Sequence, residues 1–226
     1  MMTFYTAVGK YKMVKNGLPT IITGDGRECA LDAHELILWS SLAFRILNYD
    51  ELREEFYKKE RELHILGELD FDHYINRLTM RQLIASGRDC TGVDALYDLL
   101  GHLYAVSIPN HLLVKTCTFL KLFFSRKYTL KQAALVFHKE PVEPAEKQIL
   151  ALLKHQMLST AELIQCVEKG SVSLKNSEEL MNLIYRPDNR DCDSILTDGH
   201  FTDSQIPTLT AVANLYLKQQ ILFQIL

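Results

Sequence analysis

The sequence predicts a mainly α fold of the α+β class, in which two similar units with small β-hairpins are joined by helices. Three observations predict it. Apolar residues recur every three or four positions along much of the chain, which is typical of amphipathic helices. Extended runs are few, short and bounded by turn residues such as Asn16-Gly17. Finally, core positions of the first half reappear in the second at a constant offset, for example Leu38 as Ile149 and Leu42 as Leu153.

Length and composition place the chain among ordinary globular proteins. Its 226 residues suit one large domain or two small ones, and 47% hydrophobic with 23% charged residues excludes disordered and fibrous classes. No stretch approaches the roughly 20 apolar residues needed to span a bilayer, and no apolar run follows the early lysines as in a signal peptide. We therefore expect a cytoplasmic protein with no membrane partner.

The cysteine content and the net charge exclude further classes of protein. The five cysteines are odd in number and never form a Cys-x-x-Cys pair, so we expect reduced thiols and no zinc finger. A net charge of -3 argues against a histone-like binder, but it hides a basic middle. No acid occurs between His73 and Arg88 or from Leu99 to Lys139. The alternative is chance clustering of lysines and arginines on solvated helices.

The N-terminal part of the chain is predicted to contain a hairpin and then two helices. A small hairpin is expected from residues 11–14 and 20–23, since Asn-Gly favours a tight turn. A helix begins after Leu31, capped by Asp32, and Trp39 helps to fill its core. A second helix starts after Asn48, whose side chain can accept from the backbone N–H of Glu51, and runs towards Leu63.

A third helix is predicted over residues 72–82. Four apolar residues share one face, namely Phe71, Tyr74, Ile75 and Leu78. The other face carries His73, Asn76, Arg77, Met80 and Arg81. An apolar strand seed follows at residues 83–85, and then a turn over residues 86–92 that contains Arg88.

The middle of the chain is expected to connect the two units. Residues 93–104 are predicted to form a helix, and Pro109 ends that segment. Residues 112–124 are apolar on several sides, which favours a core between the units or a dimer interface. We expect an N-terminal domain over residues 1–108, a helical connector or dimerisation segment over 109–140 and a C-terminal domain over 141–226.

The second half is interpreted as a repeat of the first. The constant offset that relates Leu38 to Ile149 also relates Glu35 to Glu146 and Asn48 to Ser159. Further along the chain a larger offset is needed, which relates Leu78 to Tyr216 and Ile84 to Leu222, and this implies an insertion in the second half. Apolar residues at helical spacing also produce accidental matches, so chance similarity is the alternative.

The order of hairpin, three helices, strand and basic turn resembles the winged helix-turn-helix superfamily of transcription regulators. Residues 48–52, 74–78 and 83–88 carry the resemblance. It implies tandem winged-helix-like units whose third helix enters the major groove of double-stranded DNA. Arg77 and Arg81 would face DNA, and Asn76 and His73 would read or water-bridge base edges. Arg88 would hold a phosphate from the wing, and a homodimer would read a palindromic site.

Two alternatives stay open beside this DNA-binding hypothesis. An exposed arginine on a helix often serves only solubility, so the chain could be a non-catalytic adaptor that binds a partner protein. The matching helix of the second half, residues 208–220, offers only Asn214 and Lys218, which suits a protein partner or a dimer contact through the C-terminal half. An enzyme is the third class.

Enzymatic and metal-binding patterns are poor. The chain has no Gly-rich phosphate loop, no His-Glu-x-x-His and no Gly-x-Ser-x-Gly. We therefore expect no catalytic residues, no cofactor and no metal. The best metal candidate lies in residues 188–200, which we interpret as an acidic loop. His34 and His102 are interpreted as core histidines.

Overall fold

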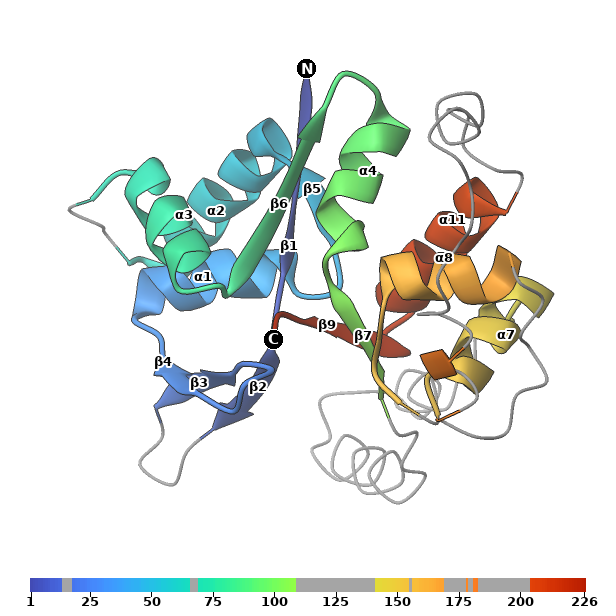
Figure 1. Cartoon of the computed structure of the whole chain (residues 1–226). Helices are drawn as coiled ribbons and strands as arrows, with labels where there is room; N and C mark the ends of the chain where they lie inside the picture. The colour runs from blue at the N-terminus through green and yellow to red at the C-terminus, as the bar shows by residue number, and fades with distance from the viewer. Residues whose placement is uncertain are drawn as a thin grey trace, which may run out of the picture.

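The computed structural model describes residues 1–13, 18–65, 69–108, 141–154, 156–168 and 204–226, with residue 178 and residues 181–182 between them. These residues form seven helices and three small antiparallel sheets, so the predicted mainly helical α+β class is confirmed (Figure 1). The helices are α1 (Ala33–Leu42), α2 (Tyr49–Leu63), α3 (Phe71–Met80), α4 (Gly92–Gly101), α7 (Pro144–Leu152), α8 (Thr160–Glu168) and α11 (Gln205–Leu217). The strands are β1 (Met2–Ala7), β2 (Lys10–Met13), β3 (Pro19–Ile22), β4 (Glu28–Ala30), β5 (Ile46–Asn48), β6 (Ile84–Asp89), β7 (Tyr104–Ser107), β8 (Leu158–Ser159) and β9 (Ile221–Gln224).

The first unit combines the sheet β5-β1-β6 with helices α1, α2 and α3. Strand β1 lies in the middle, and it pairs with β6 from Met2 opposite Asp89 to Ala7 opposite Ile84. The helix starts agree with their predicted caps, because Asp32 accepts from the N–H of Glu35 and Asn48 from that of Glu51. The predicted apolar face of α3 is buried in the core between the three helices and the sheet.

The second sheet, β2-β3-β4, contains the predicted hairpin. Lys10 pairs opposite Ile22 and Met13 opposite Pro19, so the expected two-stranded ribbon is confirmed. Strand β4 was not predicted, because three residues are too few to show alternation. Ile21 is fully buried in the core of the first unit, and Trp39 there donates its indole N–H to the carbonyl of Val8.

The second unit repeats the arrangement of the first. Its sheet has the order β8-β7-β9, so β7 takes the place of β1, β8 that of β5 and β9 that of β6. Phe4 pairs opposite Asn48, and Tyr104 opposite Ser159, in agreement with the predicted equivalence of Asn48 and Ser159.

The later offset is smaller by one position than the sequence predicted. Ala7 faces Ile84 in the first sheet, and Ser107 faces Ile221 in the second. Ile84 is therefore equivalent to Ile221 and not to Leu222. Apolar spacing along a helix tolerates an error of one position, whereas strand register does not. The implied insertion in the second half is shorter by the same amount.

Two further boundaries differ from the sequence predictions. Strand β6 continues to Asp89, so the turn expected over residues 86–92 is misplaced and Arg88 lies in a strand opposite Thr3. Helix α4 ends at Gly101, and residues 104–107, expected at the end of the N-terminal domain, pair within the second sheet as β7. Gly87 lets α4 pack closely on β6, because a Cβ there would clash with the α4 backbone at Ala95 and Leu99.

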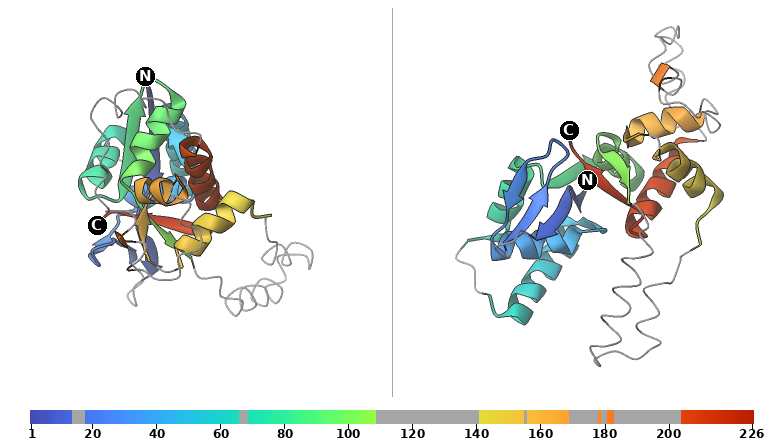
Figure 2. Two further views of the ribbon diagram at one scale, coloured as in Figure 1. Left: turned by 45° about the vertical axis from the view of Figure 1, so that its right-hand side comes forward. Right: turned by 90° about the horizontal axis from the view of Figure 1, so that it is seen from below.

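Helix α4 and the second unit cover the other face of the first sheet. Figures 1 and 2 show α1, α2 and α3 on one side of β1 and β6, with α4 on the opposite side. The second core joins Val8, which follows β1, and Ala85 of β6 to Leu99 of α4 and Val212 of α11. The end of β1 also meets β9, since the N–H of Gly9 donates to the carbonyl of Phe223 at 2.9 Å.

Several predicted segments lie outside the described residues. These are the Asn16-Gly17 turn, the connector over residues 109–140 with its apolar stretch 112–124, and the acidic loop 188–200. Among the helices that the structure describes, none is both long and apolar enough to cross a membrane.

Candidate interaction surface on helix α3

Helix α3 places the predicted contact residues in two different environments. Its buried side contacts the core through Phe71, Tyr74, Ile75 and Leu78, so the residues between them face outward. His73, Asn76 and Arg77 are exposed there, and Met80 at the end of α3 is 86% exposed. Arg81 follows the last turn and is partly buried. Arg88 is exposed but lies on β6.

Arg77 faces the start of α1. Its Nη1 lies 3.3 Å from Oδ2 of Asp32, and its Nε lies 3.1 Å from Oε1 of Glu35. The Arg77 side chain is still 46% exposed, so it keeps an open flank beside Asn76. Its charge, however, is already opposed by two carboxylates.

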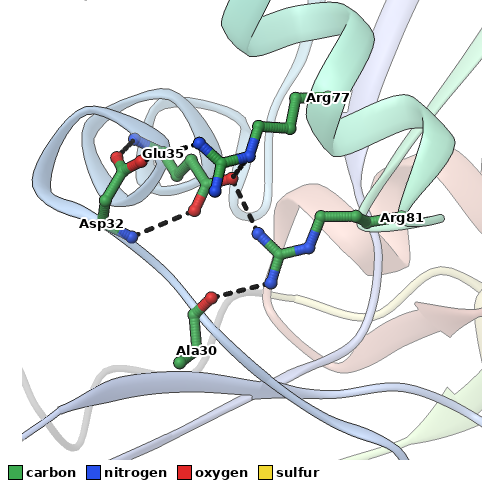
Figure 3. Close-up of polar contacts among 5 residues, drawn as sticks. All are labelled: Ala30, Asp32, Glu35, Arg77 and Arg81. Carbon is green, nitrogen blue, oxygen red and sulfur yellow. Dashed lines mark hydrogen bonds and ion pairs between the residues drawn. The ribbon is translucent and has the colours of Figure 1, made fainter.

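Arg81 is engaged more completely (Figure 3). One terminal nitrogen donates to Oε1 of Glu35 and the other to the carbonyl of Ala30, both at 2.7 Å. Burial by itself lowers the pKa of Arg81, but the hydrogen bond and charge of Glu35, together with smaller contributions from Cys29, raise that pKa above its ordinary value. The guanidinium is therefore firmly cationic and points towards α1 and β4.

Glu35 is the acceptor that gathers both arginines. Its side chain is 1% exposed. Its Oε1 accepts from Arg81 and forms an ion pair with Arg77, while its Oε2 accepts from the N–H of Asp32 at 3.0 Å. A buried carboxylate is costly unless such partners satisfy it. The four charged groups, two arginines with Asp32 and Glu35, form a neutral cluster under the exposed face of α3.

A second polar group lies at the N-terminal end of α3. The hydroxyl of Tyr49 donates to Oδ1 of Asp72 at 2.6 Å, and this hydrogen bond raises the pKa of Tyr49 to about 12. Asp72 and Arg88 both act on neighbouring Tyr5, whose pKa is raised first by burial and then by the charge of Asp72, while Arg88 opposes the rise. The backbone N–H of Arg88 donates to Asp98 on α4. Arg88 therefore also has acidic residues close to it.

The structure thus brings together His73, Asn76 and Arg77, turns Arg81 inward and keeps Arg88 on a separate element. Sequence reasoning missed Asp32 and Glu35 as partners of the arginines. Their signal was present as an Asp-x-x-Glu capping box, but it indicated only a helix start. The contact itself joins residues 46 positions apart, which no local pattern reveals.

Elsewhere, a pocket of about 220 Å³ lies beside α4, lined by Asp89, Asp94, Tyr97, Asp98, Gly101, His102 and Ala161. His102 is exposed there, so its interpretation as a core histidine was wrong, because α4 ends one residue before it. His34 is partly buried and stacks on Tyr74 with ring centroids 5.1 Å apart. Within the described ranges, no group of three or more His, Cys, Asp or Glu side chains could hold a metal ion.

Comparison of the chain with protein-family models, with curated proteins and with solved structures finds no match.

Proposed function

We propose that the chain is a non-catalytic adaptor built from two winged-helix-like units, and that the exposed face of α3 binds a partner protein. One observation carries the proposal: both arginines of the predicted DNA-reading face are paired with carboxylates of α1 and its cap.

Electrostatics separates this proposal from DNA binding. Affinity for DNA comes largely from cations that neutralise phosphates and release their counterions. Arg77 and Arg81 already neutralise Asp32 and Glu35, so a phosphate would have to compete with a buried acid for Arg81. Asp72 adds a negative charge to the same helix. A protein partner does not need a positive surface, and therefore suits this face better.

The composition of the face also favours a protein partner. Met80 is 86% exposed beside the polar Asn76 and the half-exposed Arg77. Methionine and arginine are enriched at protein interfaces relative to the remaining surface. The large exposed area of Met80 supplies apolar contact, and Asn76 and His73 supply hydrogen bonds around it.

The second unit supports the proposal from within the same chain. The equivalence of Ile84 and Ile221 also relates Asp72, Asn76 and Thr79 of α3 to Leu209, Ala213 and Tyr216 of α11. Those three residues are buried in the second core, which includes α4. In the second unit the side of the third helix that includes the Asn76 position is thus packed against protein, while Thr210 and Leu217, the equivalents of His73 and Met80, are exposed.

Site-specific photo-crosslinking tests the proposal. A photoreactive amino acid at position 76 is expected to trap one discrete partner protein in cells that express the full chain. Position 210 on α11 is the matched control, because Thr210 is exposed and equivalent to His73. Met80→Asp should abolish the crosslink on a normally folded chain. Equal crosslinking from positions 76 and 210 would overturn the proposal.

DNA binding is the second candidate, favoured by the exposure of His73, Asn76 and Arg77 along the outer face of one third helix. Fluorescence anisotropy with double-stranded DNA at low salt separates the two. The adaptor proposal expects no salt-dependent affinity. If affinity falls steeply with salt, DNA recognition takes precedence, and Arg77→Ala should then cost about 1 to 3 kcal/mol on the preferred site. In that case Arg88→Ala should weaken all sequences alike and lower the salt slope by about one.

A further inference from the structure

The third helices of both units end in the same way. Arg81 and Lys218 follow the last helical turn, and each precedes a glutamine with positive φ, 58° at Gln82 and 57° at Gln219. The next N–H then bonds to the carbonyl five residues earlier, from Leu83 to Leu78 and from Gln220 to Leu215, both at 2.9 Å. This is the Schellman pattern of helix termination, with glutamine in the place usually taken by glycine.

Each cation at this position reaches a buried glutamate on the first helix of its unit. Arg81 contacts Glu35, and Lys218 contacts both carboxylate oxygens of Glu146 at 2.7 and 2.9 Å. Both glutamates are 0% exposed as whole residues. Each also accepts the backbone N–H three residues before it, from Asp32 at 3.0 Å and from Glu143 at 2.9 Å.

The same cation binds a second, equivalent acceptor. Arg81 donates to the carbonyl of Ala30 at 2.7 Å, and Lys218 to that of Pro141 at 3.1 Å. Ala30 and Pro141 are related by the same offset in numbering as Glu35 and Glu146. We name this arrangement of cation, buried glutamate and carbonyl the helix clasp.

We propose that the cation of the helix clasp is a positioning residue that sets the orientation of the third helix on the first. Its two acceptors lie on both sides of the start of the first helix, so the cation can satisfy them only at one angle of the third helix. In the first unit this angle decides how α3 presents Asn76 and Met80. The inference rests on the proposed function only in taking α3 as the presenting helix.

The second unit separates positioning from recognition. Its third helix buries Leu209, Ala213 and Tyr216, the equivalents of Asp72, Asn76 and Thr79, yet the helix clasp is retained there. A cation that served only to recognise a partner beside the Asn76 position would have no role in that unit, where the equivalent Ala213 is buried. A cation kept to fix the helix has the same task in both.

Hydrogen exchange of the full-length protein tests the helix clasp. Arg81→Gln leaves Glu35 buried without its strongest donor, so exchange of the α3 amides should rise about tenfold or more. Arg81→Lys should keep exchange near the parent value, because Lys218 performs this role in the second unit. Amides of α11 are the internal control, and their exchange should not change.

A double variant adds a readout specific to the ion pair. Glu35→Gln combined with Arg81→Gln leaves no lone buried charge, so its α3 exchange should fall below that of Arg81→Gln alone. Unchanged exchange in Arg81→Gln, or no recovery in Arg81→Lys, would overturn the inference. So would loss of the position-76 crosslink in Arg81→Lys with normal exchange, since it would make Arg81 a recognition residue. Absence of that crosslink in every variant, with the expected exchange pattern, would overturn the adaptor proposal alone.

Discussion

Helices α3 and α11 occupy equivalent places in the two units, but one presents a polar face to solvent and the other buries it. The positions of Asp72, Asn76 and Thr79 on α3 are taken by Leu209, Ala213 and Tyr216 on α11. The helix clasp and the Schellman ending are the same in both. The fold therefore determines where the third helix lies, whereas the elements packed around the helix determine whether this face is exposed.

Helix α11 packs on α7 and α8 of its own unit, and it also contacts α4 and the first unit. Tyr216 contributes most visibly, because its hydroxyl lies 3.2 Å from the carbonyls of both Ala7 and Leu42 and accepts the N–H of Phe44 at 3.0 Å. Its ring packs on Phe44 and Phe223. The face that is open in the first unit is therefore used in the second to hold the two units together.

The largest effect is expected when the residues at one pair of equivalent positions, Leu209 on α11 and Asp72 on α3, are exchanged. Leu209→Asp puts an unpaired carboxylate into the second core, where Leu209 is 2% exposed. We expect a loss of more than about 4 kcal/mol of unfolding free energy, or no folded protein. Asp72→Leu, on the open face, loses only the exposed hydrogen bond of Tyr49 and should cost no more than about 1 kcal/mol. Urea denaturation of both variants measures the difference, and a normally stable Leu209→Asp chain would contradict the assignment of this face as buried.

Gly87 tests the close approach of α4 to the first sheet. Gly87→Ala forces the α4 backbone away from β6 and should cost about 1 to 3 kcal/mol. Its equivalent in the second unit is Gln224, which is only partly buried. Gln224→Ala should stay within about 0.5 kcal/mol. Thermal unfolding of the two variants measures the difference. Equal losses of stability would show that the packing of α4 on β6 does not require a glycine at position 87.

Tyr216→Phe removes the hydroxyl that joins the units, and should cost about 1 to 2 kcal/mol because the Phe44 N–H loses its acceptor. Thr79→Val, the exposed equivalent, should change stability little. Burial raises the pKa of Tyr216, so the stability due to its neutral phenol is complete below pH 10 and is lost as the pH rises above that value. The parent should thus lose more stability above pH 10 than Tyr216→Phe. Parallel pH slopes in denaturation would count against this role of the hydroxyl.

The smallest effect concerns the N-terminal end of α3. The hydrogen bond to Asp72 raises the pKa of Tyr49 to about 12, so this phenol should ionise later than an ordinary tyrosine. The stability that comes from the bond is complete below pH 10 and disappears between about pH 10 and 12. Ultraviolet difference titration against Tyr49→Phe isolates this group. In Asp72→Ala its pKa should return towards 10, and an unchanged titration would exclude Asp72 as the cause.

Local signals in the sequence predicted the helices well. The caps at Asp32 and Asn48 and the apolar face of α3 depend on residues within one or two turns of each other, and all were confirmed. Strands were harder, because β1 owes its place to β5 and β6, which come much later in the chain. Short strands that depend on distant partners show little pattern of their own.

The candidate site was predictable only in part for the same reason. The spacing of His73, Asn76 and Arg77 correctly indicated an outward face, since it follows directly from helical geometry. The partners of Arg81 could not be read in this way, because Ala30 and Glu35 belong to another part of the chain. Charge seen along a sequence is therefore a poor measure of charge available at a surface.

The bond between the N–H of Gly9 and the carbonyl of Phe223 bears on the order of folding. During synthesis the residues of β1 emerge long before those of β9, and this bond can form only after position 223 has been added. Tyr216 likewise reaches Ala7 across 209 positions. Contacts between segments so far apart close a large loop and slow the search for the native state. The first unit can form its own core early, whereas the end of β1 is secured only after β9 has been synthesised.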